Sequence, residues 1–210
     1  MRTRNTILAV VALVAGAGIV AAVAGATGPA QTAEVTDPAG DAKNNAEPWL
    51  DILRTRIARG GDTFTFSAKM AGALPADPPA APGGLGWYLW FWGIDVDPDL
   101  APAGYPFPKN HPAPFDFAVV FASDGEDYFA FVIDRRPLAV GQDAITTLVP
   151  SGVDGAWIDV FVDADLLDDP SAFLWRLGIV TEHARFGADG YQAPDRVPDN
   201  EAEMVPWPQN

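Results

Sequence analysis

Apolar and polar residues alternate along the stretch from Asp51 to Met70, and a glycine pair interrupts the pattern near its middle. Before the pair, Leu53, Thr55 and Ile57 alternate with two arginines, and after it the apolar members are Phe64, Phe66, Ala68 and Met70. A period of two places alternate side chains on opposite faces of a β-strand. The pair Gly60-Gly61 is typical of a turn between antiparallel strands. The stretch is therefore predicted to be a β-hairpin with one buried face, which favours an all-β fold.

The other strand patterns are short and are separated by turn residues. Residues 87–96 are apolar at nearly every position, which predicts a central strand that is covered on both faces. Further strands are predicted at 115–122, 128–134, 144–149, 156–162 and 174–181, with a turn at 150–155 and a helical turn at 165–173. No periodicity is found from residue 185 onward. This pattern, with 20 Gly and 20 Pro residues, predicts a jelly-roll-like antiparallel β-sandwich.

The N-terminal segment, residues 1–33, is predicted to be a signal peptide that precedes a β-sandwich domain at 34–210. Arg2 and Arg4 are followed by an uncharged stretch from Ile7 to Ala26, and small residues at Ala24 and Ala26 suit a signal peptidase. The apolar stretch is also long enough to span a bilayer. Two outcomes stay open: cleavage and secretion, or retention of the segment as an anchor at the cell surface.

Composition limits the partners and the chemistry of the domain. The formal net charge of −15 argues against nucleic acid and against anionic lipid as partners. The absence of cysteine excludes disulfides, thiolate metal sites and a cysteine nucleophile. Stability must therefore come from the core, with the possible addition of a bound cation. No membrane contact is predicted beyond the possible N-terminal anchor.

Several short motifs follow one another in a recognisable order. They are Thr36-Asp37-Pro38-Ala39-Gly40-Asp41, Asp51-Ile52-Leu53, the hairpin at 60–66, Trp92-Gly93-Ile94-Asp95-Val96-Asp97 and Pro194-Asp195-Arg196-Val197-Pro198-Asp199. In this order the sequence resembles exported β-sandwich domains related to family 9 carbohydrate-binding modules and to the DOMON-like group. The likeness covers most of residues 34–200. It implies a jelly-roll-like sandwich, often with a structural calcium ion, that binds a ligand rather than transforming it.

Aspartates gather at two places where carboxylates could bind a cation. One group is Asp95, Asp97, Asp99 and Asp116, and the other is Asp37, Asp41 and Asp51. In the second group, a tight turn at Gly40 can fold two carboxylates back toward the start of a strand. Ca²⁺ prefers six to eight oxygen ligands, so both groups are candidate calcium sites. The alternative is that these aspartates cap turns through hydrogen bonds to the backbone, and both interpretations stay open.

Aromatic residues supply the candidate ligand-binding surface. These residues are Trp87, Trp90, Trp92 and Tyr105. Alternation places Trp90 and Trp92 on one face of their strand and Trp87 on the other. Exposed rings can stack on a sugar, whereas buried rings belong to the core. Trp87, near the start of its strand, is expected to be the more exposed of the three.

These features favour a secreted, non-catalytic binding domain with structural calcium, whose ligand is a carbohydrate or another cell-envelope component. The chain contains no nucleophile elbow, phosphate-binding loop or H-E-x-x-H motif. One alternative is a secreted structural or protein-interaction domain that binds no small ligand. A further alternative is a glycoside hydrolase with a pair of acidic residues, which so many carboxylates leave open.

Overall fold

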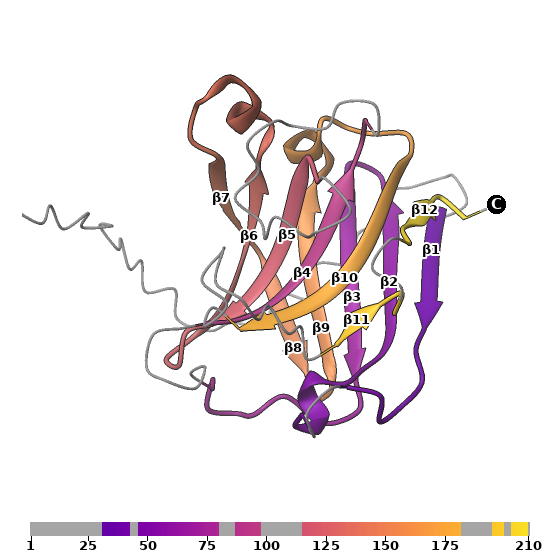
Figure 1. Ribbon diagram of the computed structural model, residues 1–210, viewed down its shortest axis with the longest axis vertical. Helices are drawn as coiled ribbons and strands as arrows, with labels where there is room; N and C mark the ends of the chain where they lie inside the picture. The colour runs from indigo at the N-terminus through magenta and orange to yellow at the C-terminus, as the bar shows by residue number, and fades with distance from the viewer. Residues whose placement is uncertain are drawn as a thin grey trace, which may run out of the picture.

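The computed structural model describes residues 31–42, 46–79, 87–97, 115–181, 195–199 and 203–209. These residues form two antiparallel β-sheets that pack face to face, so the predicted all-β sandwich is confirmed (Figure 1). Within these ranges, no helix is long and apolar enough to cross a membrane. The predicted leader lies outside the described residues, apart from its last three positions.

The first sheet has five strands in the order β1-β2-β3-β9-β8, and we call it sheet A. Its strands are β1 (Gln31–Thr36), β2 (Ile52–Gly60), β3 (Thr63–Met70), β8 (Ser151–Asp154) and β9 (Trp157–Asp163). Strand β1 pairs with β2 along its whole length, so residues 31–33, the last three of the predicted leader, belong to sheet A.

The second sheet, sheet B, has the order β11-β10-β4-β5-β6-β7, and β12 also pairs with β10. Its strands are β4 (Tyr88–Asp95), β5 (Phe117–Ser123), β6 (Tyr128–Asp134), β7 (Ile145–Val149), β10 (Phe173–Thr181), β11 (Arg196–Val197) and β12 (Val205–Trp207). Among the described residues, three short 3₁₀ helices connect strands: η2 (Pro48–Leu50), η3 (Arg136–Val140) and η4 (Ala164–Leu167).

The hairpin predicted at Asp51–Met70 is present as β2 and β3. Gly60 pairs with Thr63, and Gly61 has the positive φ of 62° that this tight turn requires. The pairing register shifts between Ile52 and Arg54. Because of this bulge, Ile52 takes the fully buried position and Leu53 is only half-buried.

The secondary structure differs from the prediction in several places, one of which is β1, since no strand is predicted at 31–36. The predicted turn at 150–155 contains strand β8, which pairs with β9 through a two-residue turn at Gly155 and Ala156. Pro150 marks the point where the chain leaves sheet B for sheet A, a place where its missing amide donor costs no ladder hydrogen bond. In addition, the tail after residue 185 contains β11 and β12, which are too short to show a period of two.

The core lies between the sheets and is rich in aromatic residues. Strand β4 is central, between β10 and β5, as the sequence predicted. Trp92 extends from β4 toward sheet A, where its Nε1 donates a hydrogen bond of 2.9 Å to Thr55 Oγ1. A second apolar cluster, which includes Phe91, Phe115 and Val120, lies on the opposite face of sheet B. Sheet B is thus apolar on both faces.

The C-terminal segment lies beside both sheets at one edge of the sandwich (Figure 1). Strands β11 and β12 pair with β10 of sheet B. Toward sheet A, Gln209 donates its amide to the carbonyl oxygen of Thr32 at 3.3 Å, and its side chain accepts the amide of Glu34 at 3.0 Å. The segment therefore places residues near the C-terminus beside β1.

Candidate metal centre

The loop that follows β1 turns sharply and returns toward the start of β2. Asp37 begins this loop, and its amide donates a hydrogen bond of 2.9 Å to the carbonyl oxygen of Leu53. Gly40 has a φ of 84°, a conformation that side-chain-bearing residues rarely adopt. Its amide donates to Asp51 Oδ2 at 2.8 Å, which fixes the turn against the start of the next strand. Asp37 and Asp41 are thereby held close together.

Asp195 reaches the same place from the opposite end of the sequence. Its Oδ2 accepts the amide of Ile52 at 2.5 Å, and its Oδ1 accepts the amide of Arg196 at 2.8 Å. Its backbone carbonyl accepts the amide of Ile179, in β10, at 2.9 Å. Asp195 is therefore hydrogen-bonded to sheet A by its side chain and to sheet B by its backbone.

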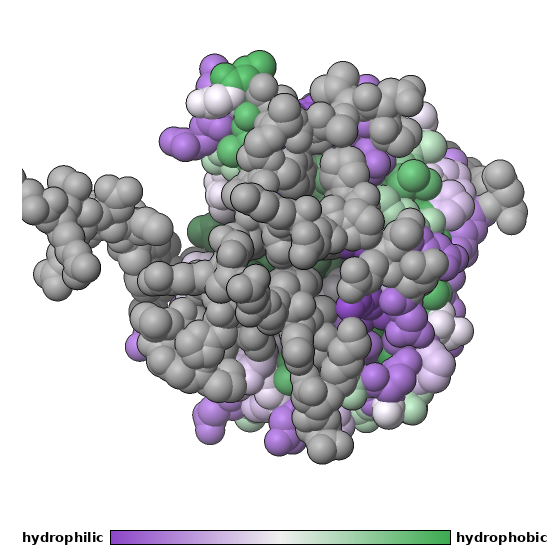
Figure 2. Space-filling view, viewed as in Figure 1, coloured by the Kyte–Doolittle hydropathy of each residue, from purple (hydrophilic) through white to green (hydrophobic). Residues whose placement is uncertain are grey.

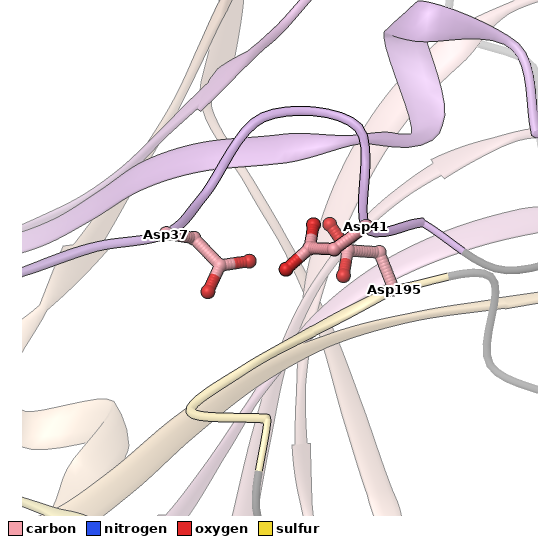
Figure 3. A group of neighbouring side chains, drawn as sticks. All are labelled: Asp37, Asp41 and Asp195. Atoms are coloured by element: carbon pink, nitrogen blue, oxygen red, sulfur yellow. The ribbon is translucent and has the colours of Figure 1, made fainter.

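The side chains of Asp37, Asp41 and Asp195 point toward one another (Figure 3). Each offers a carboxylate oxygen, and these three oxygens all lie within 4.8 Å of one another. Hydrophilic surface gathers on the side of the molecule where β11 lies near the end of β1 (Figure 2). We call these three residues, with Asp51 beside them, the aspartate cluster.

Asp51 is more buried than Asp37 and Asp41, with only 6 % of its surface exposed. One of its oxygens accepts the Gly40 amide, whereas Oδ1 is buried and has no hydrogen-bond partner among the described residues. Asp37 Oδ2 is likewise buried without a partner in the described part of the chain. Buried carboxylate oxygens are normally hydrogen-bonded or bound to a metal ion. Both oxygens are thus suited to act as ligands.

Burial and the charges of neighbouring carboxylates raise the pKa values in the aspartate cluster. Burial, followed by the charge of Asp195, raises the pKa of Asp37 to about 8. Burial also raises the pKa of Asp195 to about 7, with further contributions from the charges of Asp41 and Asp51. The pKa of Asp41 is raised by burial and by the charges of Asp199 and Asp51. A divalent cation would compensate this concentration of negative charge.

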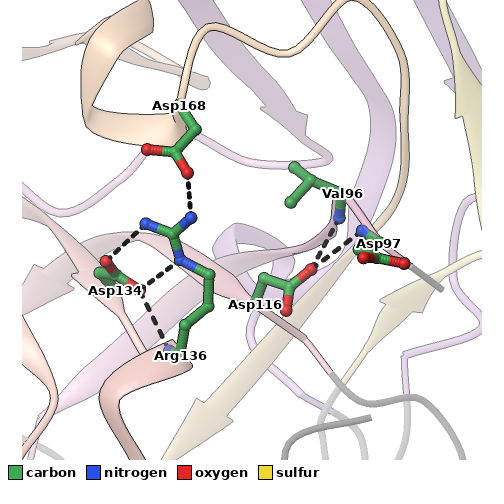
Figure 4. A network of polar contacts seen from close by, with 6 residues as sticks. All are labelled: Val96, Asp97, Asp116, Asp134, Arg136 and Asp168. Atoms are coloured by element: carbon green, nitrogen blue, oxygen red, sulfur yellow. Dashed lines mark hydrogen bonds and ion pairs between the residues drawn. The ribbon is translucent and has the colours of Figure 1, made fainter. Parts of the chain in front are cut away.

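The second aspartate group has a different arrangement. Asp116 Oδ2 accepts the amides of Val96 at 2.9 Å and Asp97 at 3.1 Å, so this carboxylate caps the end of β4 (Figure 4). Burial and the nearby charge of Asp116 raise the pKa of Asp95 to about 6. Asp99 lies outside the described residues. Asp116 therefore acts as a turn cap. A calcium site at this second aspartate group stays a prediction.

An arginine lies near this second group and links two other parts of the fold. Arg136 donates from Nε and Nη2 to the two oxygens of Asp134, at 2.9 and 2.8 Å, and from Nη1 to Asp168 (Figure 4). Its guanidinium also lies 4.4 Å from the ring centroid of Phe117. These contacts join the end of β6 to the residue that follows η4. Burial raises the pKa of Asp116, and the hydrogen bonds from the Val96 and Asp97 amides and the charge of Arg136 only partly oppose this rise.

The predicted aromatic residues differ in their exposure to solvent. Trp90 and Trp92 are fully buried between the sheets, which corrects their interpretation as exposed stacking rings. The physical reason is that β4 is central and covered on both faces. Trp87 is on the opposite face and 39 % exposed, with its ring edge-on to Phe129 at a centroid distance of 5.1 Å. Tyr105 lies outside the described residues.

Sequence reasoning identified part of the aspartate cluster and missed one member. The turn at Gly40 predicts a group of Asp37, Asp41 and Asp51; in the structure Asp37 and Asp41 converge, and Asp51 accepts the amide of Gly40 in the same turn. Sequence reasoning gave no role to Asp195, which is 143 positions away from its partner Ile52. The only available signal was the motif at 194–199, whose aspartates stand in a segment with no strand periodicity.

We find no match to this chain among protein-family models, curated proteins or solved structures. The resemblance to family 9 carbohydrate-binding modules and DOMON-like domains therefore stays a prediction from the motifs.

Proposed function

We propose that the chain is an exported, non-catalytic binding domain whose sandwich is stabilised by a calcium ion at the aspartate cluster. The observation that carries the metal part is the convergence of one carboxylate oxygen each from Asp37, Asp41 and Asp195 within 4.8 Å of one another. Asp51 is bound to the same turn through the Gly40 amide, and its other oxygen is buried with no partner among the described residues. The loop between β1 and β2 and the residue directly before β11 build this cluster. A cation there links these two segments and offsets the repulsion between their carboxylates.

Calcium fits this cluster better than magnesium. Ca²⁺ accepts six to eight oxygen ligands in a flexible geometry, whereas Mg²⁺ requires a near-ideal octahedron and keeps much of its water. The aspartate cluster is built from an irregular loop and a short strand, which favours the less demanding ion. Export is proposed from the sequence of residues 1–33, and it would expose the domain to the high calcium levels at which weak extracellular sites fill.

The proposed ligand is a carbohydrate or another neutral cell-envelope component. The net charge of −15 disfavours polyanions. Trp87 supports this proposal because its ring is 39 % exposed and is held edge-on by Phe129. A rigid, partly exposed indole offers a flat apolar surface on which a sugar ring can stack.

A glycan array with full-length protein tests the ligand. We expect binding to at least one oligosaccharide class, and Trp87→Ala should reduce it at least tenfold. Trp157→Ala is the matched control, because Trp157 is a half-buried tryptophan in sheet A and should leave binding unchanged. Elemental analysis of protein purified without chelator should find about one calcium per chain. Absence of both glycan binding and calcium would contradict the proposal.

One observation favours the alternative of a structural or protein-interaction domain. Trp90, Trp92, Trp175 and Trp207 are all fully buried and so serve the core. If the array shows no binding while calcium is present, the domain is a metal-stabilised interaction module rather than a glycan-binding one.

A further inference from the structure

We propose that the cation at the aspartate cluster acts as a clasp that fastens residues 195–199 to the sandwich, so that calcium binding and docking of this segment are coupled. This inference rests on the proposed calcium site. It predicts that calcium binding controls whether residues 195–199 are ordered against the two sheets.

Within the described residues, the backbone pairing of the clasped segment is short. Strand β11 contains only two residues, and its pairing with β10 is limited to Arg196 with Gly178 and Val197 with Leu177. Val197 is buried, and Asp195 accepts the amides of Ile52 and Ile179. A two-residue strand contributes little stability by itself, so the interactions of Asp195 have a large influence on docking.

Docking of this segment without a cation is opposed by charge. It places the carboxylate of Asp195, which is only 5 % exposed, among those of Asp37 and Asp41. Asp51 adds a fourth carboxylate, and its Oδ1 is buried with no hydrogen-bond partner in the described ranges. Like charges at such short range repel strongly in a partly buried site. A divalent cation bound between these carboxylates offsets the repulsion. It attracts both the loop after β1 and residues 195–199.

Strand β12 offers an internal contrast because apolar contacts anchor it. The Trp207 side chain is fully buried, with its ring stacked on Phe173 at a centroid distance of 5.0 Å and edge-on to Phe64 at 4.9 Å. These contacts do not depend on a cation. The clasp therefore predicts that removal of calcium loosens residues 195–199 and leaves β12 docked.

Hydrogen exchange of the full chain, resolved to single amides, tests this inference in calcium and in chelator. The reporter amides are those of Ile52 and Ile179, since both donate to Asp195. The control amide is that of Met70, which donates to the carbonyl oxygen of Ala156 in sheet A. In chelator we expect the two reporter amides to exchange at least tenfold faster, with Met70 and the amide of Trp207 unchanged.

Asp41→Asn provides the matched variant. It removes one carboxylate from the aspartate cluster but leaves Asp195 and both reporter hydrogen bonds in place. With calcium present, this variant should exchange at Ile52 and Ile179 as the wild type does in chelator. Asp143→Asn, an exposed substitution in the loop before β7, should behave as the wild type.

Three results would overturn the inference. If calorimetry shows calcium binding but the two reporter amides keep their protection in chelator, the clasp is wrong and the calcium site remains. If all four amides change together, calcium stabilises the whole fold and does not act on this segment. If calcium does not bind, both the clasp and the proposed metal site fail.

Discussion

At the scale of single residues, close packing decides what sheet B tolerates at Gly93. A Cβ placed on Gly93 would lie 2.4 Å from the ring of Phe115, which is fully buried on the outer face of this sheet. A rigid buried ring cannot move away without disturbing its neighbours Phe91 and Arg176. Glycine is therefore required here by space and not by backbone conformation.

Gly93→Ala should lower the free energy of unfolding by about 1–3 kcal/mol, the usual cost of overpacking a core. Urea denaturation measures this change. Gly152→Ala is the control, because a Cβ there meets no atom within 4 Å, and it should change stability by less than about 0.5 kcal/mol. Equal stability of the two variants would contradict the packing argument.

At the scale of elements, the two sheets are joined through the core by a hydrogen-bond chain. Trp92 Nε1 in β4 donates to Thr55 Oγ1 in β2 at 2.9 Å, and this hydroxyl donates to the carbonyl oxygen of Ser67 in β3 at 3.0 Å. All three residues are buried. A buried donor that loses its acceptor costs more than the hydrogen bond itself contributes.

Thr55→Val should therefore destabilise the protein by about 1–3 kcal/mol, because it leaves the Trp92 Nε1 group buried without an acceptor. Chemical denaturation monitored by tryptophan fluorescence provides the measurement. Thr65→Val, at a half-buried position of β3, is the matched control and should have little effect. A neutral result for Thr55→Val would mean that this link does not stabilise the sandwich.

The same elements show which features the sequence could predict. Alternation predicted β2 and β3, and the apolar run at 87–96 predicted a central strand, because burial on one or both faces leaves a pattern in neighbouring residues. Strands β8, β11 and β12 contain four, two and three residues, which is too few for a period to be seen. Strand β8 forms a tight hairpin with β9, whereas β11 and β12 pair with β10 across longer stretches of chain, which no local pattern records.

The candidate metal site likewise combines a part that a local pattern predicts with a part that a distant segment supplies. Gly40 with Asp37, Asp41 and Asp51 forms a local turn, so its convergence was predictable from spacing. Asp195 joins these residues only because β11 pairs with β10 at the edge beside β2. The burial of Trp90 and Trp92 agrees with the apolar run at 87–96, which predicts a strand that is covered on both faces.

At the scale of the whole molecule, the aspartate cluster makes stability depend on pH. Folding raises the pKa of Asp37 to about 8 and that of Asp195 to about 7, from an ordinary value of 3.8. Groups with a raised native pKa bind protons more tightly when folded, so their contribution is present at low pH. This contribution is lost as the pH rises through these values.

In chelator, the melting temperature should therefore fall between about pH 5.5 and about pH 8.5, a window above the ordinary titration of aspartate. In saturating calcium the fall should be smaller, because the cation binds the deprotonated form, so the stabilisation by calcium grows with pH. Differential scanning calorimetry across this window measures both effects. A melting temperature in chelator that rises over the same range would contradict the raised pKa values.

The most direct test of the central claim is a calorimetric titration of calcium into chelator-treated protein near pH 8, with Asp41→Asn and Asp143→Asn in parallel. We predict one site in the wild type and in Asp143→Asn, and at least tenfold weaker binding in Asp41→Asn. Calcium at about 100 times its Kd should also stabilise the fold by about 2.7 kcal/mol. Absence of binding in the wild type, or equal binding in Asp41→Asn, would contradict a calcium ion held by the aspartate cluster.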